Sequence, residues 1–304
     1  MKSLQVVTTR RPFFEEQVRA LERHGVTNEI VALPGNPGER SPLEYLQAYP
    51  RVLKRGFGEF DVVHASYGVI TPLALLQPSR PVVLTLWGSD LMGKYGDMSQ
   101  RFACYCDEVI VMSEEMERLL SCDAHVVPHG VDLKRFSPAS KTDACRQIGW
   151  KTDEKHILFP YDPERQVKNF PLAEKTVDRV RDVIEEPVNL QVLYGIDHEE
   201  VPLYMNAADV MLLTSNREGS PNTVKEAMAC NLPVIATDVG DIWDLLENVS
   251  PSAACETNDE LAQNLVETLR AEERSDGRNT IREMGLTLTQ MGKEIKRVYE
   301  YALE

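Results

Sequence analysis

Two glutamates separated by seven residues, Glu218 and Glu226, are the residues of this chain best suited to recognise a ligand. An apolar run at 208–214 precedes them and is typical of a buried parallel strand. A Gly-Ser-Pro-Asn turn follows, and then a helical pattern that ends near Asn231, with Pro233 just beyond. The predicted unit is strand, loop, helix and strand, with Glu218 in the loop and Glu226 about two turns into the helix.

The predicted loop lies where open parallel sheets bind ligands, beyond the carboxyl ends of the strands. With Ser220 as N-cap and Pro221 at the first helical position, the helix would offer free N–H groups and a positive dipole end to a diphosphate. A carboxylate beside phosphate is unfavourable unless neutral hydroxyls, such as those of sugars and ribose, donate to it. A lone glutamate pair would more simply be solvated, but the surrounding loop and strands favour a nucleotide-sugar site over an ATP site.

The remaining sequence predicts two series of alternating strands and helices. Strand-like apolar runs of the first series lie at 4–7, 29–33, 62–64, 82–86, 109–112 and 126–127. Those of the second series lie at 156–159, 189–194, 208–214 and 234–236. Such alternation is typical of βαβ units that form parallel sheets. Residues 138–155 are polar and broken by Pro and Lys, which predicts a linker between the two halves.

The charge is distributed unevenly along the 304 residues, a length that allows two domains with separate cores. The net charge of −15 argues against nucleic acid. Residues 1–150 carry 17 basic and 18 acidic side chains, whereas residues 151–304 carry 16 and 30. The simplest interpretation is a solvated acidic surface. The alternative is that the near-neutral half contacts lipid headgroups or a lipid-linked acceptor, through Arg51, Lys54 and Arg55 on one helix.

The cysteines indicate neither a disulfide framework nor a metal site. Six of them are scattered along the chain, and Cys104 and Cys106 have one spacer residue where a zinc or redox pair usually has two. His64, His125 and His129 are not at ligand spacing with that pair. No apolar stretch reaches the roughly 20 residues that a membrane helix needs, and the N-terminus lacks a signal-peptide pattern. We expect a cytoplasmic protein, with the inner face of the membrane as an alternative location, and no bound metal.

Motifs along the chain resemble, in the same order, those of the family 4 retaining glycosyltransferases, which have the GT-B fold. Segment 218–239, in which Ala-Met-Ala-Cys-Asn-Leu-Pro-Val-Ile-Ala-Thr follows the Glu pair, is similar to the donor-site signature of the family. Segments 61–65 and 83–90 resemble two N-domain strands with their loops. Segment 127–132 resembles the end of the N-domain, and 206–210 fits the strand before the first Glu. The resemblance runs through most of the chain.

The resemblance implies an α/β protein of GT-B architecture, with two Rossmann-like parallel-sheet domains facing a central cleft. It places an acceptor-side domain at 1–140 and a nucleotide-sugar donor domain at 141–286, with a closing helix at 287–304 that packs on the first domain. The implied activity is metal-independent, retaining transfer of a hexose-type sugar from a nucleoside diphosphate to a hydroxyl acceptor. The implied partners are therefore a nucleotide-sugar donor and a glycan or lipid-linked acceptor in glycan or polysaccharide biosynthesis, with no further cofactor.

The resemblance also implies roles for the donor-side residues. Glu218 matches the glutamate that contacts donor-sugar hydroxyls near the reacting carbon, and Glu226 matches the one that accepts hydrogen bonds from ribose. Lys168 and Arg165 match the basic pair that neutralises the leaving diphosphate, although they lie closer together than is usual. The loop facing sugar and phosphate would consist of Gly219, Ser220, Pro221, Asn222 and Thr223. The alternative for the basic pair is a solvated loop.

Two departures from the family pattern lie in the first half. Thr-Thr-Arg-Arg-Pro follows the first strand in place of a Gly-rich loop, so that Arg10 and Arg11 could contact an anionic acceptor. Trp87 stands where many members have His, and it either stacks on a sugar or fills the core. His64 either points into the cleft or is structural, and Asp90 either touches the acceptor or caps a turn. The acceptor-side candidates are Arg10, Arg11, His64, Trp87, Gly88 and Asp90.

Alternative functions stay open on the same fold. A UDP-sugar 2-epimerase would also use carboxylates and would need no acceptor, and a non-catalytic sugar-nucleotide-binding protein would keep the fold with an impaired site. A Rossmann dehydrogenase is disfavoured because no Gly-x-Gly-x-x-Gly follows the first strand.

Overall fold

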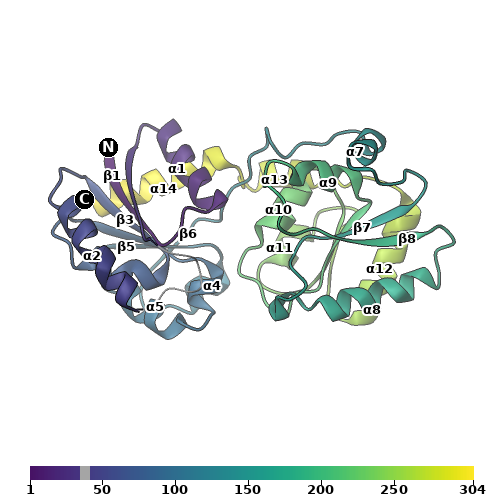
Figure 1. Cartoon of the computed structure of the whole chain (residues 1–304), viewed down its shortest axis with the longest axis horizontal. Coiled ribbons are helices and arrows are strands. Elements are labelled where there is room, and N and C mark those ends of the chain that lie inside the picture. Colours follow the sequence, from purple (N-terminus) through teal and green to yellow (C-terminus); the bar gives the residue numbers. More distant parts are fainter. Residues whose placement is uncertain (35–41) are drawn as a thin grey trace. The chain divides into compact units, whose positions relative to one another are not determined.

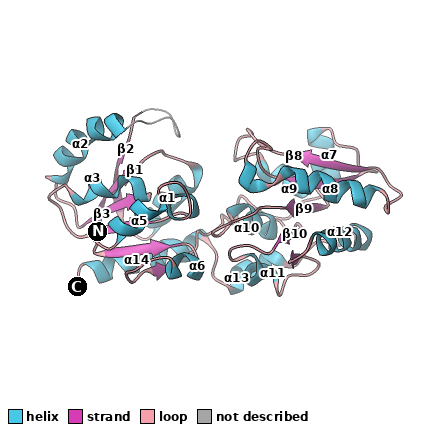
Figure 2. Cartoon of the chain, turned by 90° about the horizontal axis from the view of Figure 1, so that it is seen from below, coloured by secondary structure: helices cyan, strands magenta, loops and turns pink. Residues whose placement is uncertain are grey.

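The structure, a computed structural model, describes residues 1–34 and 42–304. Contacts within the chain divide it into two compact units, one made of residues 1–129 with 288–304 and the other of residues 130–287. Each unit is a parallel sheet with helices packed against it (Figures 1 and 2). The prediction of two Rossmann-like parallel-sheet domains is therefore confirmed.

The sheet of the first unit has the strand order β2-β1-β3-β4-β5-β6, with every pairing parallel. Its strands are β1 (Lys2–Val7), β2 (Thr27–Ala32), β3 (Val62–Ser66), β4 (Val82–Thr85), β5 (Glu108–Val111) and β6 (His125–Val126). Its helices are α1 (Pro12–Arg23), α2 (Pro42–Gly56), α3 (Thr71–Leu75), α4 (Gly88–Leu91), α5 (Gly96–Ala103), α6 (Glu114–Arg118) and α14 (Leu288–Ala302). The central strands β3 and β4 are buried throughout, as expected for strands covered on both faces.

The last helix, α14, belongs to the first unit although it follows the second unit in sequence (Figure 1). It packs on α1 so closely that a Cβ added to Gly292 would lie 2.7 Å from the carbonyl oxygen of Ala20. The hydroxyl of Tyr299 reaches the sheet, where it bonds Nε2 of Gln5 at 3.0 Å and Nδ1 of His64 at 2.6 Å. Close backbone packing thus fastens this helix to α1, and buried polar contacts fasten it to β1 and β3.

The sheet of the second unit has the strand order β11-β10-β9-β7-β8 and is also parallel. Its strands are β7 (Lys155–Phe159), β8 (Val188–Val192), β9 (Val210–Leu213), β10 (Val234–Thr237) and β11 (Ala253–Cys255). Its helices are α7 (Lys141–Ile148), α8 (Phe170–Arg181), α9 (Val201–Ala207), α10 (Asn222–Ala229), α11 (Ile242–Leu246), α12 (Asn258–Ala271) and α13 (Gly277–Glu283). The strand order reverses between β7 and β9, where open sheets of this kind hold their ligands.

The predicted linker at 138–155 is wrong, because half of this segment is helix α7 and the first residue of β7, and all of it lies within the second unit. Ser140 caps α7 by accepting a hydrogen bond from the amide of Asp143 at 3.3 Å, and Gly149 ends it at φ 76°. Ala144 and Cys145 pack against α9 from one face of α7. Only a narrow stripe of α7 is apolar, which is why its composition resembles that of a linker.

Across the described ranges, no helix is both long enough and apolar enough to cross a membrane.

Candidate functional site

The loop between β9 and α10 carries the first of the two glutamates. α10 begins at Asn222 with Pro221 as its N-cap residue, so the prediction that Ser220 is the N-cap is wrong by one position. Pro221 makes no side-chain cap hydrogen bond, and among the amides of the first turn that of Val224 already donates to the Pro221 carbonyl at 3.2 Å, which leaves those of Asn222 and Thr223 as the candidates for a ligand. The helix ends at Ala229, and Asn231 takes the predicted left-handed conformation at φ 54°.

Lys168 and Glu218 meet at the switch point of the second sheet. Lys168 lies in a 3₁₀ turn that follows β7, and Glu218 lies in the loop that follows β9. The Lys168 Nζ is 2.5 Å from Oε1 of Glu218, and both side chains are largely buried. Ser215 Oγ donates to the same carboxylate oxygen at 2.6 Å. The structure thus brings together two of the predicted catalytic residues in one charge-assisted contact.

An aromatic ring outside the predicted site residues contacts this ion pair. Nζ of Lys168 is 3.6 Å from the ring centroid of Tyr161, and the Tyr161 hydroxyl bonds Oγ1 of Thr223 at the start of α10. Burial lowers the pKa of Lys168, and the charge of Glu218 opposes that effect. Arg165 is exposed, with its guanidinium 5.8 Å from the Tyr161 ring. Tyr161 therefore connects the basic loop after β7 with the helix terminus.

The second glutamate, Glu226, is buried on α10 and is held by a histidine. His198, in the loop after β8, places Nε2 2.9 Å from Oε1 of Glu226. Nη1 of Arg135 lies 3.0 Å from the other ring nitrogen of His198, and Nη2 of Arg135 lies 3.0 Å from Oε1 of Glu199. Neither His198 nor Arg135 was predicted, because residues so far apart in sequence show no common pattern.

A buried lysine contacts the loop between β9 and α10, which carries Glu218. Lys225 is fully buried on α10 and donates from Nζ to Oγ of Ser220 at 3.1 Å. Burial lowers the pKa of Lys225 to about 8, and burial raises the pKa of Asp241 to about 6. Next to Asp241, Gly240 has φ 66°, and a Cβ there would lie 2.7 Å from the carbonyl oxygen of Glu218. The loop after β10 is thus packed directly against the loop of the first glutamate.

Together these residues form an arrangement that can bind an anion and a hydroxyl-rich group side by side. The uncapped terminus of α10 and the cations Lys168 and Arg165 attract negative charge, whereas Glu218 and Glu226 accept hydrogen bonds. Gly219 and Pro221 are buried in the loop, and Ser220, Asn222 and Thr223 are half-buried. Within residues 1–34 and 42–304, no group of three or more His, Cys, Asp or Glu side chains could hold a metal ion.

Two of the acceptor-side candidates lie in the interior of the first unit. His64 is completely buried, and its Nε2 is 2.7 Å from Oγ1 of Thr85 while its Nδ1 contacts Tyr299. Burial lowers the pKa of His64 to about 3, so this ring is neutral at ordinary pH. Trp87 is 8% exposed and packs 4.5 Å, centroid to centroid, from Phe13. The structure places both rings among core residues of the first unit.

The other acceptor-side candidates occupy turns near the carboxyl ends of β1 and β4. Gly88 is the first residue of α4, and the buried carboxylate of Asp90 accepts hydrogen bonds from the amides of Trp87 and Gly68, each at 2.7 Å. Burial raises the pKa of Asp90 to about 7. Arg10 forms an ion pair with Glu15, and Arg11 is the exposed residue preceding α1. Asp90 thus caps a turn, and the two arginines remain on the surface.

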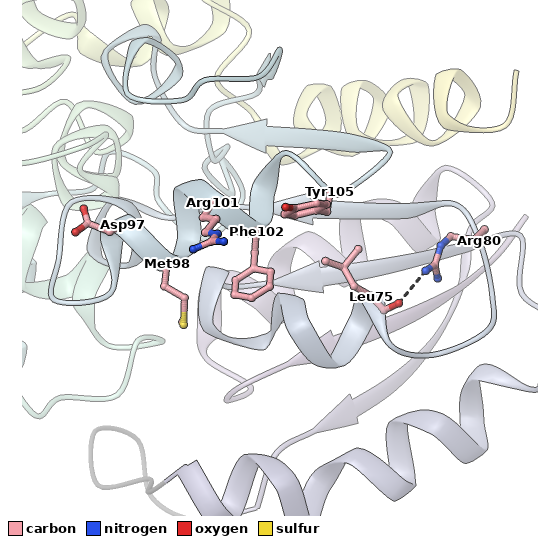
Figure 3. Close-up of a pocket in the computed structure, with 7 residues that line it drawn as sticks. All are labelled: Leu75, Arg80, Asp97, Met98, Arg101, Phe102 and Tyr105. Carbon is pink, nitrogen blue, oxygen red and sulfur yellow. Dashed lines mark hydrogen bonds between the residues drawn. The ribbon is translucent and has the colours of Figure 1, made fainter.

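A groove of about 690 Å³ on the first unit contains none of the predicted residues (Figure 3). Its lining residues come mostly from α5 and the end of α3: Leu75, Arg80, Asp97, Met98, Arg101, Phe102 and Tyr105. Arg80 is committed to backbone carbonyls, including that of Leu75 at 2.8 Å, which Figure 3 marks with a dashed line. The exposed lining of the groove is mainly apolar, and none of the donor-side residues lines it.

Solved structures define the class of fold. Sucrose-phosphate synthase from Thermosynechococcus elongatus superposes with a TM-score of 0.78 and 16% identity, over 99% of each chain. A glycosyltransferase from Rickettsia africae superposes with a TM-score of 0.73 and 14% identity, over 100% of this chain and 98% of the other. HepE of Anabaena, solved with UDP-glucose, has a TM-score of 0.70 and 16% identity, over 99% and 100%. The fold is that of the GT-B glycosyltransferases.

Sequence comparison then finds two family matches. Residues 3–135 match Glycosyltransferase Family 4, and residues 173–271 match Glycosyl transferases group 1. Both matches are to glycosyltransferase families, as the motifs predicted.

Curated relatives agree with that assignment. TuaC of Bacillus subtilis (strain 168), a glycosyltransferase provisionally assigned to teichuronic acid biosynthesis, is 28% identical over 61% of this chain and 55% of its own. The lipopolysaccharide core mannosyltransferase LpsB of Rhizobium meliloti is 27% identical over 46% and 48%. N-acetyl-alpha-D-glucosaminyl L-malate synthase of Bacillus anthracis is 32% identical over 70% and 66%. The chain thus spans about half the length of the first two relatives.

Proposed function

We propose that the protein is a glycosyltransferase that moves a hexose-type sugar from a nucleoside diphosphate to a hydroxyl acceptor, in glycan or polysaccharide biosynthesis. The observation that carries this proposal is the contact between Lys168 and Glu218 at the switch point of the second sheet, beside the uncapped terminus of α10. Glu226 lies farther along the same helix. The UDP-glucose bound by HepE, which has the same fold, supports the choice of donor.

The diphosphate would bind at the terminus of α10. The amides of Asn222 and Thr223 and the positive end of the helix dipole would attract its oxygens. Lys168 and Arg165 would neutralise the charge that develops on the diphosphate as it leaves the sugar. These groups supply the positive charge that a metal ion could otherwise provide, so we propose that no metal is required. Gly219, Ser220 and Asn222 would present the loop to the sugar and the phosphates.

The hydroxyls of the donor would bind the two glutamates. Glu218 would accept from the sugar near the reacting carbon, and Glu226 would accept from the ribose. Each such charge-assisted bond is worth roughly 1.5–3 kcal/mol, so that loss of either carboxylate should weaken donor binding substantially.

We propose that the transfer retains configuration. Glu218 already accepts hydrogen bonds from Lys168 and Ser215, which makes its carboxylate a poor nucleophile. The bond between the sugar carbon and the phosphate oxygen would break while the acceptor oxygen attacks the same face of an oxocarbenium-like sugar. The acceptor proton would pass to the departing phosphate oxygen. This route requires no covalent intermediate with the enzyme.

An acceptor attached to lipid would bring the first unit near a membrane. Arg51, Lys54 and Arg55 line, together with Phe60, a groove of about 740 Å³ between α2 and β2. Arg55 is paired with Glu29 at 2.7 Å. The basic residues on one side of α2 support contact with anionic headgroups at the cytoplasmic face, where we propose that the protein acts.

The proposal is tested by a thermal-shift panel of UDP, GDP, ADP and their sugar conjugates, on the wild-type protein and on Glu226→Ala. A ligand present at about 100 times its dissociation constant should stabilise the folded protein by roughly 2.7 kcal/mol. We expect one nucleotide to stabilise the wild type with EDTA present, and the shift to be much smaller in the variant. The absence of any shift, in a sample that melts cooperatively, would refute the proposed donor site.

A further inference from the structure

Hydrogen bonds connect two loop residues of the second unit to Glu226 on helix α10. Arg135 precedes α7, His198 lies between β8 and α9, and Glu226 lies on α10. Arg135 Nη1 is 3.0 Å from Nδ1 of His198, and Nε2 of His198 is 2.9 Å from Oε1 of Glu226. Arg135 is itself held by Glu199, at 3.0 Å from Nη2, and by its backbone amide, which donates to Oδ1 of Asp132.

The chemistry of arginine decides which nitrogen of His198 carries the proton. A guanidinium can only donate hydrogen bonds, so Nδ1 of His198 must accept one from Arg135. The proton of the neutral ring is therefore on Nε2, which faces the carboxylate of Glu226 and donates to it. A doubly protonated ring would place an N–H of His198 against an N–H of Arg135. Arg135 thus selects the neutral tautomer that donates to Glu226.

The contact with His198 has a consequence for the carboxylate of Glu226. A carboxylate has about four acceptor positions on its two oxygens, and His198 occupies one of those on Oε1. The carboxylate is consequently held in one orientation before any ligand arrives, and Oε2 remains able to accept from a ligand. Because α10 and the loop after β8 are separate elements, this contact also fixes the distance between them.

We propose that His198 and Arg135 are positioning residues that hold the carboxylate of Glu226 ready to accept hydrogen bonds from the ribose hydroxyls of the donor. This inference rests on the proposed function, because it takes the ligand of Glu226 to be a ribose. No motif of the chain indicates a role for this pair, and the proposed role predicts that the pair strengthens the preference for ribonucleotides over 2′-deoxyribonucleotides.

The matched variants are His198→Ala, His198→Gln and Arg135→Met. The glutamine has both a donor and an acceptor and should restore most of what alanine loses. His125→Ala is the control, because His125 makes a similar contact with Glu108, at 2.6 Å, in the first unit. Calorimetric titration would use UDP, GDP and ADP together with their 2′-deoxy counterparts.

We expect His198→Ala to weaken binding of the preferred ribonucleotide on the order of tenfold and binding of its deoxy counterpart far less. His125→Ala should change neither affinity. In a Glu226→Ala background, His198→Ala should have no further effect, because the two residues act through one contact. The inference would be overturned if His198→Ala weakened the binding of both nucleotides equally. It would also be overturned if His198→Ala weakened binding just as much in the Glu226→Ala background.

A measurement without ligand separates this inference from the proposed function. Imidazole ¹⁵N–¹H correlation spectra should show His198 with its proton on Nε2 in the wild type and a mixture of tautomers in Arg135→Met. A proton on Nδ1 in the wild type would overturn the role of Arg135 whatever the protein binds. The correct tautomer without binding of any nucleotide would instead refute the proposed function, and with it the ribose as the ligand of Glu226.

Discussion

Replacing Gly240 with alanine tests whether the loop that carries Glu218 must keep its position. Gly240 has φ 66°, and an added Cβ would lie 2.7 Å from the carbonyl oxygen of Glu218 and 2.9 Å from that of Gly219. Both neighbours are backbone atoms of the loop proposed to face the donor, so they cannot move aside as a flexible side chain could. The substitution therefore combines backbone strain with a displacement of the site.

The size of the effect follows from comparison with Gly149. Gly149 has φ 76° and no atom within 4 Å of an added Cβ, so Gly149→Ala carries only the strain of the left-handed conformation. That strain is about 1–2 kcal/mol for an alanine. Gly240→Ala should lose the same free energy of unfolding, plus roughly 1–3 kcal/mol for the overpacked contact. We therefore expect Gly240→Ala to be less stable than Gly149→Ala by roughly 1–3 kcal/mol.

Two assays separate strain from displacement. Urea unfolding gives the loss of stability of each variant, and titration with UDP, GDP and ADP gives the loss of affinity. We expect Gly149→Ala to bind like the wild type and Gly240→Ala to bind at least about tenfold more weakly. If both variants lost equal stability and bound equally well, the close approach of the two loops would have no role in holding the site.

Three further predictions concern polar groups that are buried or partly buried. Burial lowers the pKa of His64 to about 3 in the folded protein, whereas the same side chain has a pKa of about 6.5 in the unfolded chain. As the pH drops from about 6.5 toward 3, the unfolded chain therefore binds a proton that the folded protein does not, and the free energy of unfolding should fall by up to about 1.4 kcal/mol per pH unit. Urea midpoints of His64→Gln should depend less on pH over that range, and an identical dependence would contradict the assignment. Arg278→Met should lose at least about 3 kcal/mol in the same assay, since its guanidinium donates to three backbone carbonyls at 2.6–2.7 Å. Asp90→Asn should lower the free energy of unfolding by about 1–3 kcal/mol, because Gly68 and Trp87 donate to different oxygens of Asp90 and one of these becomes an NH2 donor in the variant; an unchanged melting temperature would refute this.

The order of elements could be predicted from the sequence because parallel strands are buried on both faces. Their apolar runs stand out between polar helices, and nearly every predicted run lies on an observed strand. Local chemistry also predicted one helix end correctly, at Asn231, since an asparagine adopts the left-handed conformation more readily than most residues. Where the local signal is ambiguous, as at α7 with its narrow apolar face, the prediction failed.

The residues that surround the two glutamates show why the rest required the structure. Tyr161, His198 and Arg135 have ordinary sequence surroundings, and only their contacts with Lys168 or Glu226 reveal a role. Trp87 was equally suited to a sugar or a core, and its packing against Phe13 is decided by residues far away in the chain. A pattern within one segment carries no information about such contacts.

The sequence by itself determined most of the strands and helices, though not α7 or β11, and it showed where acids and bases follow a strand. It could not determine that Lys168 and Glu218, 50 positions apart, would touch. That contact exists because β7 and β9 are neighbours in the sheet although β8 lies between them in sequence. Strand order is set by the packing of the whole unit, and only that packing brings the two loops to the same edge of the sheet.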